Sequence, residues 1–334
     1  MKKYRILCLT DHDKHSKENS LYAILSVMSQ HSRCEEVIVA SRSAKINSRF
    51  FEHSDFSIIY GLAVTAAFKF EVAKKDLHEN TFVVDPNEFD IIFLRLPRPV
   101  SDEFLSSLEL EFNTKCIINK PSGIITCSNK AVLLNFQDVC PPIKLCHSVK
   151  EIIEFSEHYD AVLKPLKEFG GRGIVRIMNK VVSDDNQSWE VLEYLKSIES
   201  TIIQDGYLAM KYLENVSKGD KRLIVVGGEV LAASLRLPSG DSWLCNVAKG
   251  ATSVASQADE DELRIIERIN PYLNKHGILI YGADTLVDDN GQRTLSEINA
   301  LSIGGFPQAE EQTGKPIIKI TIDKIVDYAD IYYQ

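Results

Sequence analysis

The first third of the chain alternates short apolar runs with amphipathic stretches. The apolar runs predict three strands, at residues 4–10, 35–41 and 89–97. The amphipathic stretch at residues 16–31 predicts a helix. We expect Ser16 or Asn19 to cap the helix. Alternating strands and helices predict an open, mostly parallel α/β sheet over about residues 1–118. No GxGxxG follows the first run, so the dinucleotide-binding fingerprint is absent.

A tight turn between two apolar runs is the strongest local signal near the C-terminus. Asn290-Gly291 is typical of a two-residue hairpin turn, in which both central residues need φ > 0. In that register Asp289 pairs with Gln292.

Counting outward from this turn brings three oxygen donors together. Asp284 falls directly opposite Glu297, and strand alternation puts Asn299 on the same face as Glu297. Opposed carboxylates repel one another, and a hard divalent cation such as Mg²⁺ converts that repulsion into binding. The alternative is a solvated hairpin face. The apolar runs around the turn favour a central hairpin and therefore the metal site.

A glycine-rich turn within residues 161–177 predicts an anion site. Gly170, Gly171 and Gly173 allow backbone N–H groups to approach a phosphate closely. Lys164 lies in the apolar run before this turn, where a lysine either extends its amine to water or is held by an anion.

Other basic residues stand at the ends of predicted elements. Arg95 and Arg98 follow a strand, and ligands of parallel sheets bind beyond the carboxyl ends of strands. Arg95 is a candidate for binding a carboxylate, or else a surface arginine, and the surface interpretation is favoured for Arg98. Lys130 opens a predicted helix against the helix dipole, which indicates either a nearby anion or a solvated side chain. Arg222 and Arg236 bracket a hairpin and either face one cleft or are edge charges.

Composition narrows the function classes. The 334 residues carry a net charge of −9, which argues against a general nucleic-acid surface. No apolar run approaches the roughly 20 residues of a membrane span. The seven cysteines show no CxxC and no metal spacing, as expected of reduced thiols in a cytoplasmic protein.

The order of these features resembles the ATP-grasp superfamily, and most closely the prokaryotic-type glutathione synthetases. The resemblance covers nearly the whole chain from residue 94 onward. Its firmest matches are INKPSG (118–123), LKPLKEFGGRGI (163–174), GDKRLIVV (219–226) and LSEINALS (295–302).

The resemblance implies an ATP-dependent carboxylate–amine ligase that forms an amide through an acyl phosphate. It implies ATP with Mg²⁺ or Mn²⁺ as cofactors, small carboxylate and amine substrates, and a homo-oligomer. It divides the chain into an N-terminal α/β domain at 1–118 and an ATP-grasp domain at 119–334, with a lid at about 147–210.

The resemblance also implies individual roles. The residues expected at the nucleotide are Lys130, Lys164, Gly170, Gly171, Gly173, Lys211, Tyr212, Leu213 and Asp220. Those expected in catalysis are Arg222 and Arg236, and those expected at the carboxylate substrate are Arg95 and Asn246. The expected metal ligands are Asp284, Glu297 and Asn299.

The chain departs from the family's pattern at several positions. Leu244 replaces a basic residue, Lys167 replaces an aspartate, and the turn at 302–305 lacks a proline. These departures predict a substrate pair other than that of glutathione synthetase. Two alternatives stay open, a small-molecule kinase on the same fold and a non-catalytic Mg²⁺-ATP-binding regulator.

Overall fold

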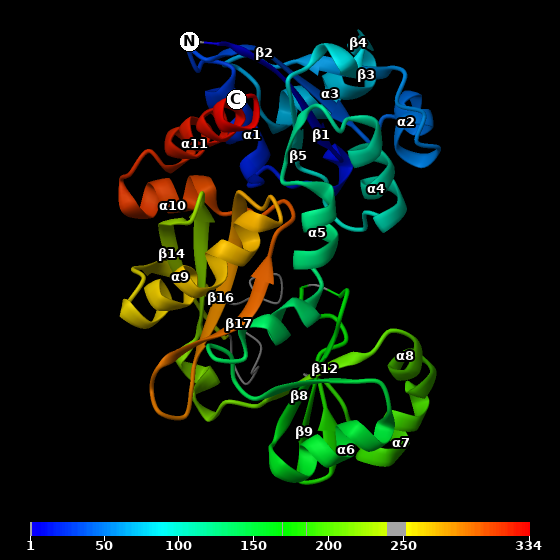
Figure 1. The fold of residues 1–334 in the computed structure, drawn as a ribbon, viewed down its shortest axis with the longest axis vertical. Coiled ribbons are helices and arrows are strands. Elements are labelled where there is room, and N and C mark those ends of the chain that lie inside the picture. Colours follow the sequence, from blue (N-terminus) through cyan, green and yellow to red (C-terminus); the bar gives the residue numbers. More distant parts are fainter. Residues whose placement is uncertain (1, 169, 185, 239–251) are drawn as a thin grey trace.

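The computed structural model describes residues 2–334 except 169, 185 and 239–251. In this part of the chain, the strands form three sheets distributed along the long axis of the molecule (Figure 1). No helix within these residues is long and apolar enough to cross a membrane.

The first sheet is the predicted mostly parallel α/β sheet. Its strand order is β4-β3-β2-β1-β5-β6, with parallel pairing from β2 to β6 and antiparallel pairing at the β3–β4 edge. The strands are β1 (Tyr4–Thr10), β2 (Cys34–Ser41), β3 (Ile59–Ala63), β4 (Phe82–Val84), β5 (Ile91–Leu94) and β6 (Cys116–Ile118). The accompanying helices are α1 (Ser20–Met28), α2 (Ser48–Glu52), α3 (Phe70–Glu79), α4 (Asp102–Glu111) and α5 (Pro121–Cys127).

Two predicted boundaries in this sheet change. The cap of α1 is Asn19, whose Oδ1 accepts from the Leu21 N–H at 2.9 Å, and not Ser16. The predicted strand at 89–97 shortens to β5.

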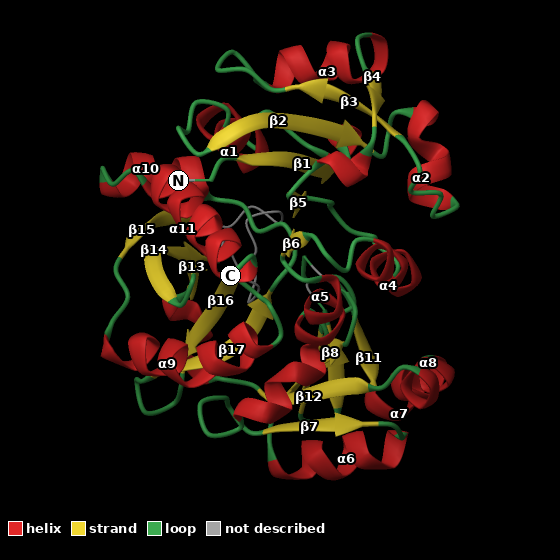
Figure 2. Ribbon diagram, turned by 45° about the horizontal axis from the view of Figure 1, so that its top comes forward, coloured by secondary structure: helices red, strands yellow, loops and turns green. Residues whose placement is uncertain are grey.

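The second sheet has its own hydrophobic core. Its strand order is β11-β10-β9-β8-β12-β7, and one cluster of buried residues between 146 and 209 fills the space under it. The strands are β7 (Ile143–Cys146), β8 (Ala161–Pro165), β9 (Val175–Met178), β10 (Val181–Ser183), β11 (Ser188–Glu190) and β12 (Tyr207–Lys211). Helices α6 (Val149–His158), α7 (Val191–Ser197) and α8 (Glu199–Gln204) lie around it (Figure 2).

The third sheet carries the predicted hairpins. Its strand order is β15-β14-β13-β16-β17, and it is antiparallel throughout. The strands are β13 (Asp220–Val226), β14 (Glu229–Leu237), β15 (Thr252–Ser256), β16 (Ile280–Val287) and β17 (Arg293–Asn299). Helix α9 (Glu260–Lys275) lies between β15 and β16 in the sequence, and α10 (Phe306–Thr313) and α11 (Ile317–Tyr332) follow β17.

The C-terminal helix returns to the first sheet. Helix α11 packs against α1, as Figure 1 shows at the top of the molecule, and the Tyr4 hydroxyl donates to Asp330 at 2.5 Å. Residues of β1, β13 and α11 belong to one buried cluster, so the first and third sheets share a core.

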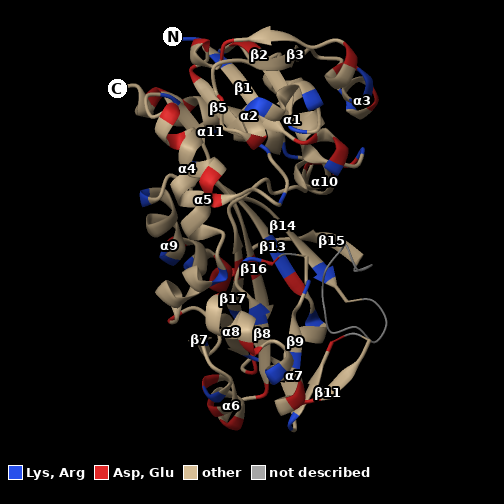
Figure 3. Ribbon diagram, turned by 90° about the vertical axis from the view of Figure 1, so that its right-hand side faces the viewer, with Lys and Arg blue, Asp and Glu red and all other residues tan. Residues whose placement is uncertain are grey.

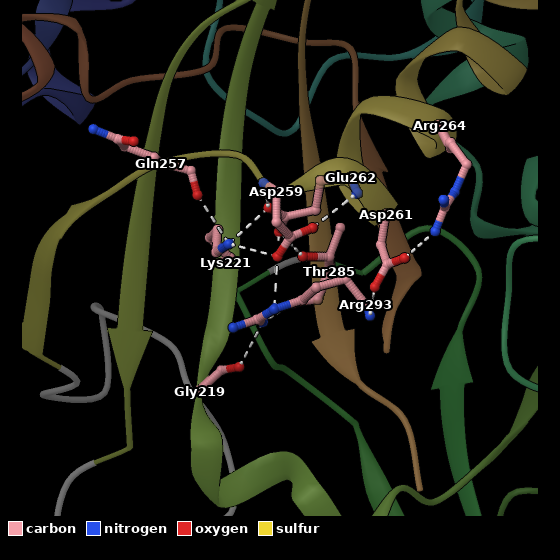
Figure 4. A network of polar contacts seen from close by, with 9 residues as sticks. All are labelled: Gly219, Lys221, Gln257, Asp259, Asp261, Glu262, Arg264, Thr285 and Arg293. Carbon is pink, nitrogen blue, oxygen red and sulfur yellow. Dashed lines mark hydrogen bonds and ion pairs between the residues drawn. The ribbon is translucent and has the colours of Figure 1, made fainter. Parts of the chain in front are cut away.

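A buried ionic network fixes β13 to α9 (Figure 4). Lys221 donates to Glu262 at 2.7 Å and to Asp259 at 3.2 Å, and the Thr285 hydroxyl donates to Glu262 at 2.6 Å. Asp259 and Glu262 also form the capping box that begins α9. Because side chains alternate along β13, holding Lys221 on this face directs its two neighbours in sequence to the opposite face.

Replacing Glu262 by Gln should destabilise the fold. The change would remove the fully buried counter-charge of Lys221, and breaking a buried ion pair costs about 3–5 kcal/mol. The free energy of unfolding in urea measures this loss. The matched control is Arg264→Gln, since Arg264 pairs with Asp261 in the same helix but its side chain is 63% exposed. We expect a change below about 0.5 kcal/mol for that control, and equal effects of the two variants would contradict the assigned role of Glu262.

Candidate active site between the second and third sheets

The β16–β17 turn is one residue longer than predicted. Asp288, and not Asp289, closes it, because the Asp288 N–H donates to the Gln292 carbonyl at 2.8 Å. The Asp288 carboxylate accepts from the N–H groups of Asn290 and Gln292, which stabilises this longer turn. Gly291 has φ of 88°, whereas Asn290 lies outside the positive region. The predicted two-residue turn is therefore wrong.

A β-bulge restores the predicted pairing farther along the hairpin. The register shifts by one residue at Ser296, and beyond it Asp284 lies opposite Glu297 as predicted. Asn299 follows on the same strand, and its Nδ2 is 3.4 Å from Asp284 Oδ2. Two carboxylates and an amide thus converge on one face.

Two buried lysines approach these donors. Lys164 Nζ donates to the Ser296 carbonyl at 3.1 Å, and Lys130 Nζ lies 3.8 Å from Glu297 Oε1 while donating to the Glu168 carbonyl. Burial lowers the pKa of both lysines, and the Glu297 charge offsets that effect only in part. Such desolvated cations favour an anionic ligand beside them.

Two arginines pair with two aspartates on the neighbouring strands. Arg222 Nη2 donates to Asp284 Oδ2 at 2.5 Å, with a second bond from its Nε. Arg236 Nη2 donates to Asp220 at 2.6 Å and lies 2.9 Å from Asp284 Oδ2. Basic and acidic segments on these strands can be seen in Figure 3.

The two aspartates occupy opposite electrostatic environments. Burial raises the pKa of Asp220 to about 6, and the charge of Asp284 adds to the rise. Burial acts in the same direction on Asp284, but Arg222 and Arg236 outweigh it and lower the pKa of that carboxyl to about 2. Asp284 is therefore the permanently charged member of the pair.

A cavity of about 270 Å³ lies over this cluster. One part of its lining is apolar, formed by Val162, Ile174, Met210, Leu213, Val216 and Leu286. The other part is polar, formed by Lys164, Gly170, Gly171, Lys211, Tyr212, Asp220, Arg222, Arg236, Asp284, Ser296, Glu297 and Asn299. An apolar end beside an ionic end suits a ligand with a flat hydrophobic ring and charged oxygens.

The glycine-rich loop joins β8 to β9 at the rim of this cavity. Gly170, Gly171 and Gly173 have φ of 70°, 75° and 66°, so the backbone there needs glycine. The first two line the cavity. Gly173 is not among the described lining residues, and a Cβ added to it would meet Pro165 Cγ at 2.9 Å. Of the three glycines of the predicted anion site, only Gly170 and Gly171 therefore lie at the cavity.

The segment after β12 supplies another wall. Lys211, Tyr212 and Leu213 line the cavity as predicted for the adenine side. The Tyr212 N–H donates to the Asp160 carbonyl at 2.7 Å, and Lys211 Nζ pairs with Asp289 at 2.6 Å.

Arg95 lines a second cavity, of about 260 Å³. Asn299 belongs to the linings of both cavities, so the two adjoin. Arg98 also lines the second cavity, and burial lowers its pKa to about 10. The surface interpretation of Arg98 is therefore wrong. No motif in the sequence singles out His15 and Ser128, which line the same cavity from loops.

Two further positions singled out in the sequence are Asn246 and Lys167. Asn246, with Leu244 two positions before it, lies outside the described residues. Lys167 is exposed and pairs with Asp102 at 2.9 Å.

Comparison with known proteins then decides the family. Residues 129–314 match the family described as prokaryotic glutathione synthetase, ATP-grasp domain. The chain belongs to this family. The match includes the predicted nucleotide and metal residues and three of the four firmest segments of the resemblance, and it begins after the first sheet and after the fourth segment, INKPSG (118–123).

Curated relatives extend the likeness over most of the chain. The chain is 28% identical to the glutathione synthetase of Neisseria meningitidis serogroup A over 289 residues, which cover 82% of this chain and 87% of that protein. It is 30% identical to the glutathione synthetase of Nitrosomonas europaea over 243 residues, covering 71% and 72%. The ATP-grasp protein is thus an enzyme, a ligase that forms an amide bond with consumption of ATP.

Solved structures confirm the ATP-grasp fold. D-cycloserine synthetase DcsG has a TM-score of 0.66 at 12% identity, covering 96% of this chain and 99% of that one. The ATP-grasp ligase PsnB, in a complex with a precursor variant, Mg and ADP, has a TM-score of 0.59 at 14% identity, covering 98% and 99%.

The residues of the first cavity fit a nucleotide and a divalent cation. Asp220 Oδ1 and Arg236 Nε are buried without a hydrogen-bond partner among the described residues. These two atoms can therefore, respectively, accept a hydrogen bond from a bound ligand and donate one to it. Carboxylate and amide oxygens are the ligands that Mg²⁺ prefers, and buried lysines match phosphate oxygens.

Proposed function

We propose that the enzyme joins a small carboxylic acid to an amine through an acyl phosphate, using Mg²⁺-ATP bound in the first cavity. The supporting observation is the convergence of Asp284, Glu297, Asn299 and Lys164 at one end of a cavity whose other end is apolar. Lys130 does not line the cavity, but its Nζ lies 3.8 Å from Glu297 Oε1.

In this proposal, two groups of residues hold the nucleotide. The apolar walls and the backbone of Tyr212 and Leu213 receive the adenine. Lys130, Lys164 and the amides of Gly170 and Gly171 receive the phosphates, because buried cations and backbone N–H groups bind phosphate oxygens strongly.

Glu297, Asn299 and Asp284 would hold the metal, which supplies charge neutralisation of the phosphate oxygens. In the structure Asp284 is paired with Arg222 instead. Exchange of that guanidinium for a divalent cation keeps the carboxylate paired and frees Arg222 to face the substrate.

The reaction needs no protein nucleophile. An oxygen of the substrate carboxylate attacks the γ-phosphorus, ADP leaves, and an acyl phosphate forms. The amine nitrogen then attacks the carbonyl carbon, phosphate leaves, and the nitrogen loses a proton. Arg236 stabilises the transferring phosphoryl charge, and Arg222 and Arg95 position the acid. The glycine-rich loop excludes water from the acyl phosphate.

The domain division proposed here is 1–118 and 119–334, with a lid at about 147–210. The separate core of residues 146–209 supports the lid. A homo-oligomeric state and a cytoplasmic location stay predictions.

The test is ADP release from Mg²⁺-ATP with a panel of acids, dipeptides and amines that includes γ-glutamylcysteine with glycine. We expect ADP and phosphate only when one acid and one amine are both present, and a product mass equal to their sum less water. Transfer of a phosphoryl group to an alcohol would instead establish a kinase. Binding of Mg²⁺-ATP without turnover on the whole panel would contradict the ligase and establish a regulator.

A further inference from the structure

The second cavity contains buried polar atoms that no contact within the described residues satisfies. Arg95 and Ser128 are 4% and 6% exposed, and Arg95 Nε and Ser128 Oγ have no hydrogen-bond partner among those residues. His15 Nδ1, in the lining of the same cavity, is also buried without one. Three such atoms around one cavity indicate a ligand, because buried polar groups are nearly always hydrogen-bonded.

The cavity is built on fixed elements. Arg95 follows β5 and lines the cavity, and its Nη2 donates to the Ile303 carbonyl at 2.7 Å. The Ser302 hydroxyl donates to the Leu96 carbonyl at 2.7 Å, so the loop after β17 is tied to the first sheet. The arginine is thus held before any ligand arrives, and little ordering is needed on binding.

The charge of the lining is one-sided. Arg95 and Arg98 both contribute guanidinium groups, and none of the described lining residues is Asp or Glu. Burial, with the nearby charge of Arg95, lowers the pKa of His15 to about 4, so its imidazole is neutral at pH 7 and donates or accepts one hydrogen bond without charge. An anion therefore finds partners here, whereas an ammonium group finds no carboxylate among the described lining residues.

We propose that this cavity binds a bare anionic end of the acid substrate, a carboxylate or phosphate without an adjacent ammonium, and that His15 and Ser128 are its specificity residues. The proposal rests on the proposed function, since the adjoining first cavity, which shares Asn299, would activate the opposite end of the same acid. A free amino-acid head would be disfavoured by the two arginines.

The binding test uses calorimetry with the full chain and Mg²⁺ plus a non-hydrolysable ATP analogue, so that no turnover is needed. Glutarate, glutamine, butyrate and 4-phosphonobutyrate are titrated, because the only carboxylate of glutamine carries an adjacent ammonium. We expect glutarate or 4-phosphonobutyrate to bind at least about tenfold more tightly than both glutamine and butyrate, and the tighter of the two identifies the anion as carboxylate or phosphate. Glutamine binding as tightly as both of these anions, or failure of both to bind, overturns the proposal.

Variants test the named residues. Ser128→Ala and His15→Phe should weaken binding of the preferred anion at least about threefold while leaving the affinity for the ATP analogue and the melting midpoint unchanged. Arg95→Met should abolish anion binding, and Arg49→Met, at an exposed arginine of the same sheet region, is the control. Unchanged binding in the Ser128 and His15 variants removes them as specificity residues. The proposed function is tested separately by ADP release. If no acid leads to ADP release although an anion binds in the second cavity, the proposed function fails and the anion site stands.

Discussion

Replacing Glu297 by Gln is expected to abolish turnover while the fold is retained. Glu297 stands opposite Asp284 across the hairpin and 3.8 Å from Lys130, so its charge serves both the metal and the phosphate-side lysine. Gln keeps the length of the side chain but removes the negative charge, and hard cations depend on carboxylate charge for affinity. We expect ADP release to fall at least about 1,000-fold, which corresponds to about 4 kcal/mol of transition-state stabilisation.

The control for this variant is Glu229→Gln. Glu229 lies on β14 of the same sheet, is exposed, and pairs with Lys324 at 2.8 Å. Turnover and melting midpoint should both match those of the unmodified chain. Full activity in Glu297→Gln, or an unfolded Glu297→Gln variant, would contradict the metal assignment.

Replacing Lys164 by Met is expected to separate stability from nucleotide binding. Lys164 is buried with its amine on the Ser296 carbonyl, and burial already lowers the pKa of that amine. Burial disfavours the charged amine, so exchanging it for an apolar side chain of similar length removes that desolvation cost, and we expect the free protein to lose little stability. The same change removes a charged hydrogen bond to phosphate, so affinity for Mg²⁺-ATP should fall about 100-fold, or about 2.7 kcal/mol.

Calorimetry and thermal melting measure the two effects independently. Lys167→Met is the matched control, because Lys167 is exposed three residues away and pairs with Asp102 at the surface. Its nucleotide affinity should not change. A Lys164→Met variant that binds Mg²⁺-ATP normally would exclude Lys164 from the phosphate site.

Local patterns predicted much of the fold because they are set by nearby residues. The cap of α1 at Asn19 and the hairpin bracketed by Arg222 and Arg236 depend on residues within a few positions. The hairpin at 280–299 shows the limit of such reasoning. The pairing of Asp284 with Glu297 was predicted from a turn that is wrong by one residue, and it survives because a bulge at Ser296 compensates. Nothing in the letters of β17 distinguishes a bulge from regular pairing.

The second cavity could not be predicted because it is assembled from distant segments. Arg98 looked like a surface arginine, since a local window does not show that it lines one cavity together with the loop after β17. His15 and Ser128 stand in loops without any motif, and their unsatisfied atoms become visible only in three dimensions. The pairing of Arg222 with Asp284 has the same origin, because it joins strands 62 positions apart.

The most direct test of the account is a crystal structure with Mg²⁺ and a non-hydrolysable ATP analogue. We predict the triphosphate between Lys130 and Lys164, with a metal about 2.0–2.1 Å from oxygens of Glu297 and Asn299. A nucleotide bound outside the cavity between the second and third sheets, or a metal held without Glu297, would contradict it.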